Sequence, residues 1–332
     1  MAGEKSKKSG EIGEALASAL LDRIGWKHLI HNIAISCNTP THVNDEGNPR
    51  QSHGEDQIYL YNNPFHDDRT DFVHVSNKNI IGSYPKEGTL RTQFKAHIKE
   101  LGQTIECAKY NQTLRGIATN FKAKKSRNHA GLLIWLHNDH EDIEKSILDD
   151  LAPSRLELNT DAPFYVIDNG RATFLLKVVD DLRRRSVGGD YHFFYPRIGT
   201  SITVDEMRTG KELPLELLAA DIIPAVLSVN GSKELIIYAN ESFDSTSYKN
   251  LMAYGLSVSL FMAGSRVNTL WSTMAVAPTV VRRFSLAPRL PALGVCSSYW
   301  HGWSAVSAWR GLSHQDSIFR GGRHCPPARH GV

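Results

Sequence analysis

The chain has 332 residues, of which 41% are hydrophobic and 22% are charged, as in soluble globular proteins. No uninterrupted apolar run approaches the ~20 residues that a membrane helix needs. The first residues, MAGEKSKKSGEIGE, lack the apolar core of a secretory signal. The composition therefore excludes a membrane-spanning protein, and we expect a cytoplasmic location with no membrane partner.

The net charge of +3 belongs to one end of the chain. Residues 1–249 contain 17 Lys and 13 Arg against 34 acidic residues, a net charge of −4. Residues 250–332 contain 8 Arg, no Lys and a single acid, Asp316, a net charge of +7. A nucleic-acid function must therefore be argued from site residues, because the overall charge does not carry it.

The cysteines are far apart in the sequence and form no Cys-x-x-Cys pair. The four of them are Cys37, Cys107, Cys296 and Cys325. This spacing predicts free thiols in a reducing compartment and argues against a zinc site.

The first 130 residues alternate between helical and strand patterns. A helix is predicted between an N-cap at Ser9 and a C-cap at Gly25, with an apolar stripe at helical spacing made of Ile12, Ala15, Leu16, Ala19, Leu20 and Ile24. Strands are predicted over 29–36, 57–61, 72–76 and 131–136, with a polar loop over 38–54 and a turn over 62–70. A long helix is predicted over 90–114, followed by a basic connector over 122–129. The order is helix, three strands, helix, strand.

The middle of the chain continues as a second α/β region. The patterns predict helices over 141–151 and 172–185, strands over 164–167 and 234–239, and a candidate strand over 191–195. We therefore expect a first domain over 1–130 and a second α/β region over 131–260.

Residues 261–332 do not resemble the rest of the chain. Hydrophobic periodicity is largely lost there, and four of the six Trp occur in this stretch together with many Pro, Arg and Ser. One interpretation is a basic tail that binds a partner or nucleic acid. The other is a change of reading frame near residues 261–270, which we favour because a selected tail would rarely exclude Lys and Glu together. Either way we expect a poorly packed tail without catalytic residues.

Several residues match the needs of metal-dependent phosphodiester hydrolysis, which requires a divalent cation, an activated water and charge stabilisation at phosphorus. Mg²⁺ prefers oxygen ligands and usually takes one or two carboxylates. Asp56 begins the second predicted strand, and Lys78 follows the third, where period-2 alternation puts it on the same face as Ser76. The first helix offers Glu11 and Glu14 on one flank.

The order of these residues resembles the PD-(D/E)XK nuclease superfamily, in the segments GEIGEALASALL, HGEDQIYLYNNP and DFVHVSNKN. The resemblance implies an α/β fold, with a nuclease-like mixed sheet flanked by helices. It also implies a metal-dependent nuclease, with DNA as the favoured substrate. It implies catalytic roles for Glu14, Asp56, Ser76 and Lys78, with Mg²⁺ or Mn²⁺ held by Glu14 and Asp56. The segments also resemble the nuclease subunit of a two-gene bacterial anti-phage defence system, which implies a second subunit as partner.

One position departs from the superfamily pattern, which has Asp, Glu or sometimes Gln two residues before the Lys. Here that residue is Ser76, and a neutral hydroxyl is a weak Mg²⁺ ligand. Ser76 can act through a water, Glu14 or Glu11 can compensate, or the domain has lost cleavage. The alternative function is thus an inactive nuclease fold that binds nucleic acid or scaffolds a partner subunit. RNA is a further candidate substrate.

Other polar clusters have simpler explanations. In LHNDHEDIE, Asn138 and Glu141 have capping-box spacing, so these acids are expected to begin a helix and not to bind a metal. His74 on a strand is expected to be a packed, hydrogen-bonded histidine, and Asp71 a strand-start residue. The connector over 122–129 is balanced between a solvated loop and a phosphate contact.

Overall fold

The computed structural model of the chain describes residues 2–44, 46–151, 161–196, 208–240, 244–259, 266–271 and 282–285. All of them belong to one compact unit, Met1–Pro288. No helix in these ranges combines the length and the apolar character that crossing a membrane requires.

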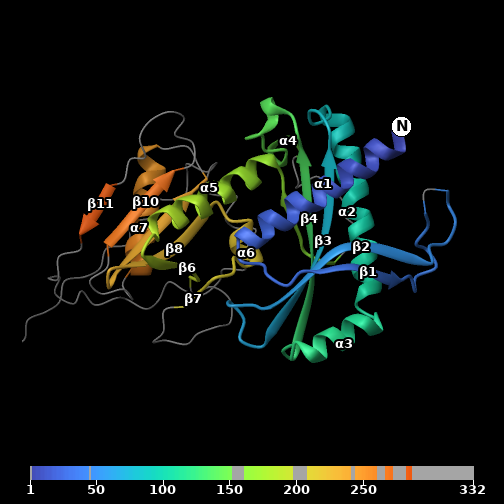
Figure 1. The fold of residues 1–332 in the computed structure, drawn as a ribbon, viewed down its shortest axis with the longest axis horizontal. Coiled ribbons are helices and arrows are strands. Elements are labelled where there is room, and N and C mark those ends of the chain that lie inside the picture. Colours follow the sequence, from blue (N-terminus) through green and yellow to red (C-terminus); the bar gives the residue numbers. More distant parts are fainter. Residues whose placement is uncertain are drawn as a thin grey trace, which may run out of the picture. The chain divides into compact units, whose positions relative to one another are not determined.

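The first sheet has five strands in the order β1-β2-β3-β4-β5 (Figure 1). They are β1 (Ile30–Ser36), β2 (Ser52–Asn62), β3 (Arg69–Ile80), β4 (Ser126–His137) and β5 (Phe164–Ile167). The first three pair antiparallel, and β3, β4 and β5 pair parallel. The sheet is therefore mixed, as expected. The expected domain boundary at residue 130 falls inside β4, so this sheet includes strands that the sequence assigned to the second region.

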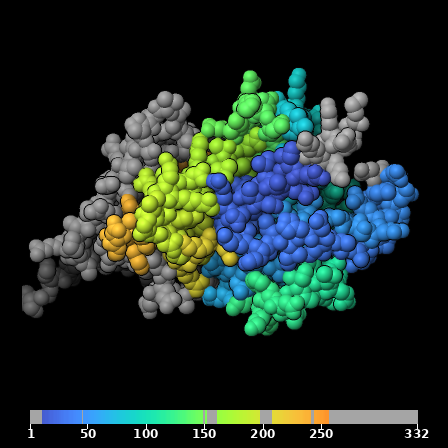
Figure 2. Space-filling view, in the orientation of Figure 1, coloured from blue at the N-terminus to red at the C-terminus, as the bar shows by residue number. Residues whose placement is uncertain are grey.

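One face of this sheet is covered by α1 (Ala2–Arg23) and α5 (Asn169–Arg185), which share a hydrophobic core with β2, β3 and β4. Figure 2 shows the two helices side by side on one surface, where Arg23 and Asp180 form an ion pair of 2.6 Å.

The buried stripe of α1 differs from the predicted one, because Ile12 and Leu16 are about half exposed while Ala17 is fully buried. Gly13 packs against Asn79 of β3 so closely that a side chain would not fit. The close approach of helix and strand thus selects small residues.

The other face is covered by α2 (Glu87–Ala108) and α3 (Gln112–Asn120). The sequence predicted a single helix over 90–114. The structure breaks it at residues 109–111, because the Asn111 side chain accepts a hydrogen bond from the amide of Leu114 at 3.1 Å and caps a new helix. Similarly, the helix predicted over 141–151 is a short 3₁₀ turn, η1 (His140–Asp142), and a four-residue helix, α4 (Leu148–Leu151).

The second sheet has the strand order β11-β10-β9-β8-β6-β7. Its strands are β6 (Gly189–Phe194), β7 (Thr209–Gly210), β8 (Ile222–Val229), β9 (Ser232–Ala239), β10 (Arg266–Trp271) and β11 (Arg282–Ser285). The helices α6 (Leu215–Leu218) and α7 (Ser245–Ser259) belong to the same part of the chain. The predicted strands over 191–195 and 234–239 correspond to β6 and β9. Most of the predicted tail over 261–332 lies outside the described residues, but β10 and β11 fall within it.

Trp26 ties the two sheets together, and it is almost completely buried. Its ring stacks on Tyr59 of β2 at 4.8 Å. Its indole N–H donates to the carbonyl oxygen of Leu213, just before α6, at 2.8 Å. The shared core fixes the side of the first sheet that α1 covers. The polar residues Asp56 of β2 and Lys78 of β3 lie beyond the last paired residues of these two strands, Gln57 and Val75.

Candidate functional site

The strands β2 and β3 stop pairing where the sequence places its candidate residues. Their register ends with Gln57 opposite Val75. Just beyond it, Oδ2 of Asp56 accepts a hydrogen bond from the backbone amide of Asn77 at 2.8 Å. A half-buried carboxylate therefore contacts the middle of the tripeptide from Ser76 to Lys78, and the structure brings these predicted residues together.

The alternation of side chains along β2 is interrupted at Asp56. Gln57 donates a hydrogen bond to Oγ of Ser18 on α1 at 2.7 Å. Glu55, two residues earlier, instead contacts Nδ1 of His74 at 2.5 Å, on the face that α2 covers. Residues two apart on a regular strand would share a face, so this irregularity, like a β-bulge, re-aims the side chains.

Lys78 lies on the face that α2 covers. Its Nζ atom forms an ion pair of 3.1 Å with Oε2 of Glu100 on α2, and the two side chains are 27% and 46% exposed. One turn earlier on α2, burial together with the positive charge of Lys78 lowers the pKa of His97 to about 4. Lys78 and Glu100 thus form an accessible charged pair beside a neutral histidine.

Glu14 occupies a different position. It is exposed on α1, the helix that packs on the opposite face of the sheet. Among the residues that the structure describes, no hydrogen bond or ion pair joins Glu14 to Asp56, Ser76 or Lys78. Its neighbour Gly13 packs on Asn79, so this turn of α1 lies over the end of β3.

A buried polar chain runs beneath the Asp56 contact. Nε2 of His74 lies 2.9 Å from Nδ1 of His129 on β4, while its Nδ1 contacts Glu55. Burial raises the pKa of Glu55, and His74 opposes that shift. His74 is therefore a packed, hydrogen-bonded histidine, as the sequence predicted.

Two residues beside Asp56 keep unused donors and acceptors. Oε2 of Glu55 and both polar atoms of the Asn77 side chain are buried, and within the described residues they have no hydrogen-bond partner. Buried polar atoms in folded proteins normally have partners. The carboxylates of Glu55 and Asp56 and the Ser76 hydroxyl are oxygen groups, the type of ligand that Mg²⁺ and Mn²⁺ prefer.

The sequence missed Glu55 and Glu100. The regular alternation of a strand would point Glu55 and Asp56 to opposite faces, and nothing in the sequence reports the irregularity between them. Glu100 lies on the polar side of a helix, where most acids are solvated. Only the three-dimensional fold shows that it reaches Lys78.

Comparison with known proteins identifies the family of the first part of the chain. Residues 1–171, which include the whole first sheet and helices α1 to α4, match the family model described as GAPS4 protein PD-(D/E)XK nuclease domain. Neither a search of curated proteins nor a search of solved structures found a match. The matched region covers more than half of the chain and has the mixed sheet and flanking helices that the resemblance implied. The chain belongs to the GAPS4 family of PD-(D/E)XK nuclease domains.

Proposed function

We propose that the protein hydrolyses phosphodiester bonds of DNA with the help of Mg²⁺ or Mn²⁺ at Asp56, Ser76 and Lys78. The observation that carries the proposal is the 2.8 Å hydrogen bond from the Asn77 amide to Asp56, which holds a carboxylate against the tripeptide that ends in Lys78. A divalent cation bound there would activate a water and stabilise charge on the phosphate.

In this proposal Glu100 supplies the acid that Ser76 lacks. Its carboxylate lies 3.1 Å from the Lys78 ammonium, and an acid two residues before the Lys on one strand face would occupy the same neighbourhood. Asp56 and Glu100 would then hold the cation. Glu14 stays in the proposed ligand set on the family resemblance alone.

Lys78 orients the attacking water and offsets negative charge on the phosphate. An ammonium has three donors, and the contact with Glu100 uses one of them. Its partial exposure leaves the other donors accessible to substrate. Because the ion pair limits the freedom of the long side chain, less conformational entropy is lost when substrate binds.

The proposal extends to a biological role. We infer that the protein cleaves phage nucleic acid in the bacterial cytoplasm, together with a second defence-system subunit. The phage substrate and the second subunit are inferred from the family resemblance, and the location from the sequence. The competing function is an inactive nuclease fold that binds nucleic acid or scaffolds that subunit, and the neutral Ser76 is the observation that favours it.

Incubation of the purified chain with supercoiled plasmid or RNA tests these alternatives. Reactions contain Mg²⁺, Mn²⁺ or EDTA, with and without the product of the neighbouring gene. Metal-dependent cutting of DNA that Asp56→Asn abolishes is the expected result. If the wild-type chain and the Asp56→Asn variant bind DNA equally well and neither cuts under any of these conditions, the inactive-fold alternative holds.

A further inference from the structure

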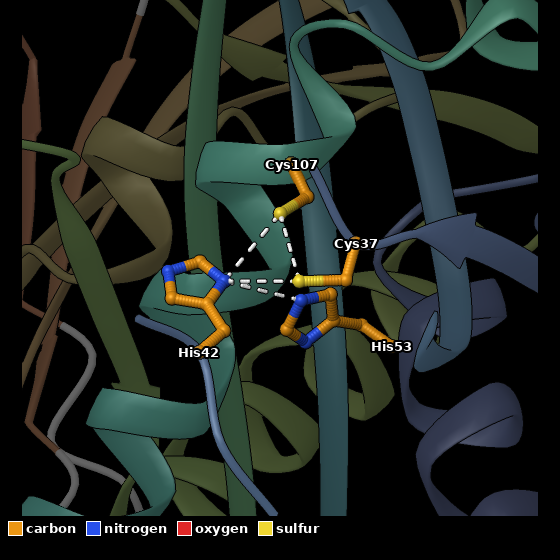
Figure 3. Close-up of side chains that lie close together, drawn as sticks. All are labelled: Cys37, His42, His53 and Cys107. Atoms are coloured by element: carbon orange, nitrogen blue, oxygen red, sulfur yellow. Dashed lines mark hydrogen bonds between the residues drawn. The ribbon is translucent and has the colours of Figure 1, made fainter. Parts of the chain in front are cut away.

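Four potential metal ligands converge at a place that the nuclease proposal does not use. Cys37 directly follows β1, His42 lies in the loop between β1 and β2, His53 is the second residue of β2, and Cys107 lies in the last turn of α2. Figure 3 shows their side chains pointing toward one another. One ligand atom from each residue lies within 4.8 Å of every other.

Four of the six distances between these atoms match the edges of a zinc tetrahedron, and the other two, from His53 to each sulfur, lie within 4.8 Å. Zinc bonds of about 2.3 Å to sulfur and 2.05 Å to nitrogen imply edges of about 3.8 Å between two sulfurs, 3.6 Å between sulfur and nitrogen and 3.3 Å between two nitrogens. The two Sγ atoms, of Cys37 and Cys107, are 3.9 Å apart. Nδ1 of His42 lies 3.6 Å from Sγ of Cys37, 3.5 Å from Sγ of Cys107 and 3.3 Å from Nε2 of His53.

Hydrogen bonds alone do not account for this arrangement. Nδ1 of His42 faces three heteroatoms at once, yet a ring nitrogen carries either one proton or one lone pair. It can therefore satisfy only one of them. A cation at the centre would instead take the lone pairs of all four ligand atoms.

The surroundings favour the ligand forms of both histidines. Nε2 of His42 lies 3.2 Å from a carboxylate oxygen of Glu106, so it can donate its proton there and keep the Nδ1 lone pair free, as in carboxylate–histidine–zinc sites. The His53 side chain is buried, an environment that disfavours a charged imidazole ring. Nδ1 of His53 has no partner among the described residues.

We infer that Cys37, His42, His53 and Cys107 bind one zinc ion as a closed structural site. Binding replaces the two thiol protons, which leave to solvent, and the Zn²⁺ with its two thiolates carries no net charge. That neutrality suits a site in which three of the four residues are buried. Four protein ligands leave no open position for substrate, so the role is structural.

The site would fasten the long β1–β2 loop to the end of α2. That loop spans residues 37–51 and, among its described residues, contains a single isolated bridge, between Val43 and Pro49. His53 stands three residues before Asp56, so the ion would also fix the strand end from which Asp56 extends. The absence of a Cys-x-x-Cys pair argued against zinc in the sequence, but here the ligands come from segments 70 residues apart.

Metal analysis of the full chain, purified without a polyhistidine tag, tests the inference. Elemental analysis should find about one zinc ion per chain. Replacement by Co²⁺ should give the intense visible bands of a tetrahedral site and the near-ultraviolet charge-transfer bands of thiolate ligands. Both readouts use the wild-type chain and need no cleavage activity, so they stand whether or not the nuclease proposal does.

Variants then assign the ligands. Cys37→Ser and Cys107→Ser should each lose most of the zinc and the thiolate bands, whereas a Cys296→Ser/Cys325→Ser double variant should keep them. Asp56→Asn should also keep the zinc. Wild-type protein with less than about a tenth of an ion per chain, Co²⁺ spectra without thiolate bands, or a disulfide between Cys37 and Cys107 in the protein as isolated would each overturn the inference.

Discussion

The Nζ atom of Lys78 lies 3.1 Å from Oε2 of Glu100, a residue 22 positions further along the chain on a different element. This ion pair connects the end of β3, which carries the candidate lysine, to α2. Because Ser76 provides no carboxylate, Glu100 is the described acid that directly contacts this lysine, and its importance for cleavage can be measured.

Glu100→Gln should lower the rate of plasmid cleavage by roughly 100-fold or more, as loss of an electrostatic catalytic group does. The melting temperature should change little, because an exposed ion pair contributes at most about 1 kcal/mol. The matched control is Glu87→Gln on the same helix, whose carboxylate pairs with Arg91. Equal cleavage by the Glu100→Gln variant and the wild type would remove Glu100 from the site.

Moving the acid back to β3 is a stricter test of the same idea. Ser76→Asp in the Glu100→Gln background should restore part of the lost cleavage, because alternation puts residues 76 and 78 on one face. Ser76→Ala alone should retain most of the activity. A complete loss in Ser76→Ala would instead show that the hydroxyl takes part directly.

In the proposed site Asp56 has both a structural and a chemical role, and two substitutions separate these roles. Asp56→Asn keeps an oxygen that can accept the Asn77 amide hydrogen bond but removes the charge, so cleavage should be abolished at nearly unchanged stability. Asp56→Ala should in addition lower the free energy of unfolding by about 1–3 kcal/mol, because it leaves that half-buried amide unpaired. Denaturant unfolding and cleavage rates, measured on both variants, check this. Equal stability of the two would show that the hydrogen bond has no net effect.

The polar chain beneath the site predicts a pH dependence. Burial lowers the pKa of His129 to about 3, and the charges of His74, Lys109 and Arg127 act in the same direction. In the unfolded chain a histidine binds its proton near pH 6.5. Between about pH 6.5 and about pH 3 the unfolded state therefore binds more protons, and stability falls as the pH falls, by up to about 1.4 kcal/mol per pH unit.

His129→Gln should reduce that loss, because it removes the ionisable ring and keeps a polar side chain next to His74. The measurement is the free energy of unfolding of wild type and variant at several pH values between neutral and about pH 5. His140→Gln, at an exposed histidine, is the control and should follow the wild type. Parallel curves for His129→Gln and wild type would contradict the assignment.

The sequence predicted what repeats regularly and missed what depends on contacts between distant elements. The strands of the first sheet are runs of alternating or continuous apolar residues, so their positions were visible. The large side chains Ile12 and Leu16 suggested the wrong buried stripe on α1, because only the packed structure shows that Gly13 must meet Asn79.

The second sheet shows a similar limit. The sequence patterns predicted no strand over residues 222–229, where the structure has β8 between β9 and β6. Pro224 interrupts the apolar run of β8, and a proline in such a run usually argues against an interior strand. In the candidate site, Asp56 and Lys78 were recognisable from their order and strand positions. Glu55 and Glu100 were not, since their positions depend on an irregular strand and on the docking of α2.

The last prediction concerns the C-terminal segment, where two shortened chains separate the alternatives. A chain ending at residue 260 lacks β10, which pairs in parallel with β9 from Glu234 to Ala239. Its loss would expose the edge of a strand whose Leu235 and Ile237 are buried with Leu251 of α7, and an exposed apolar edge is prone to aggregation. The melting temperature should therefore fall by roughly 2 °C or more, the shift that about 1 kcal/mol produces in a domain of this size.

A chain ending at residue 288 keeps β10 and β11 and should melt like the full chain. Both should still cut DNA, because Asp56, Lys78 and Glu100 all lie within residues 1–171. If the chain of 260 residues is as stable as the full chain, β10 does not contribute to the fold, and a change of reading frame near residues 261–270 becomes the better explanation of the tail.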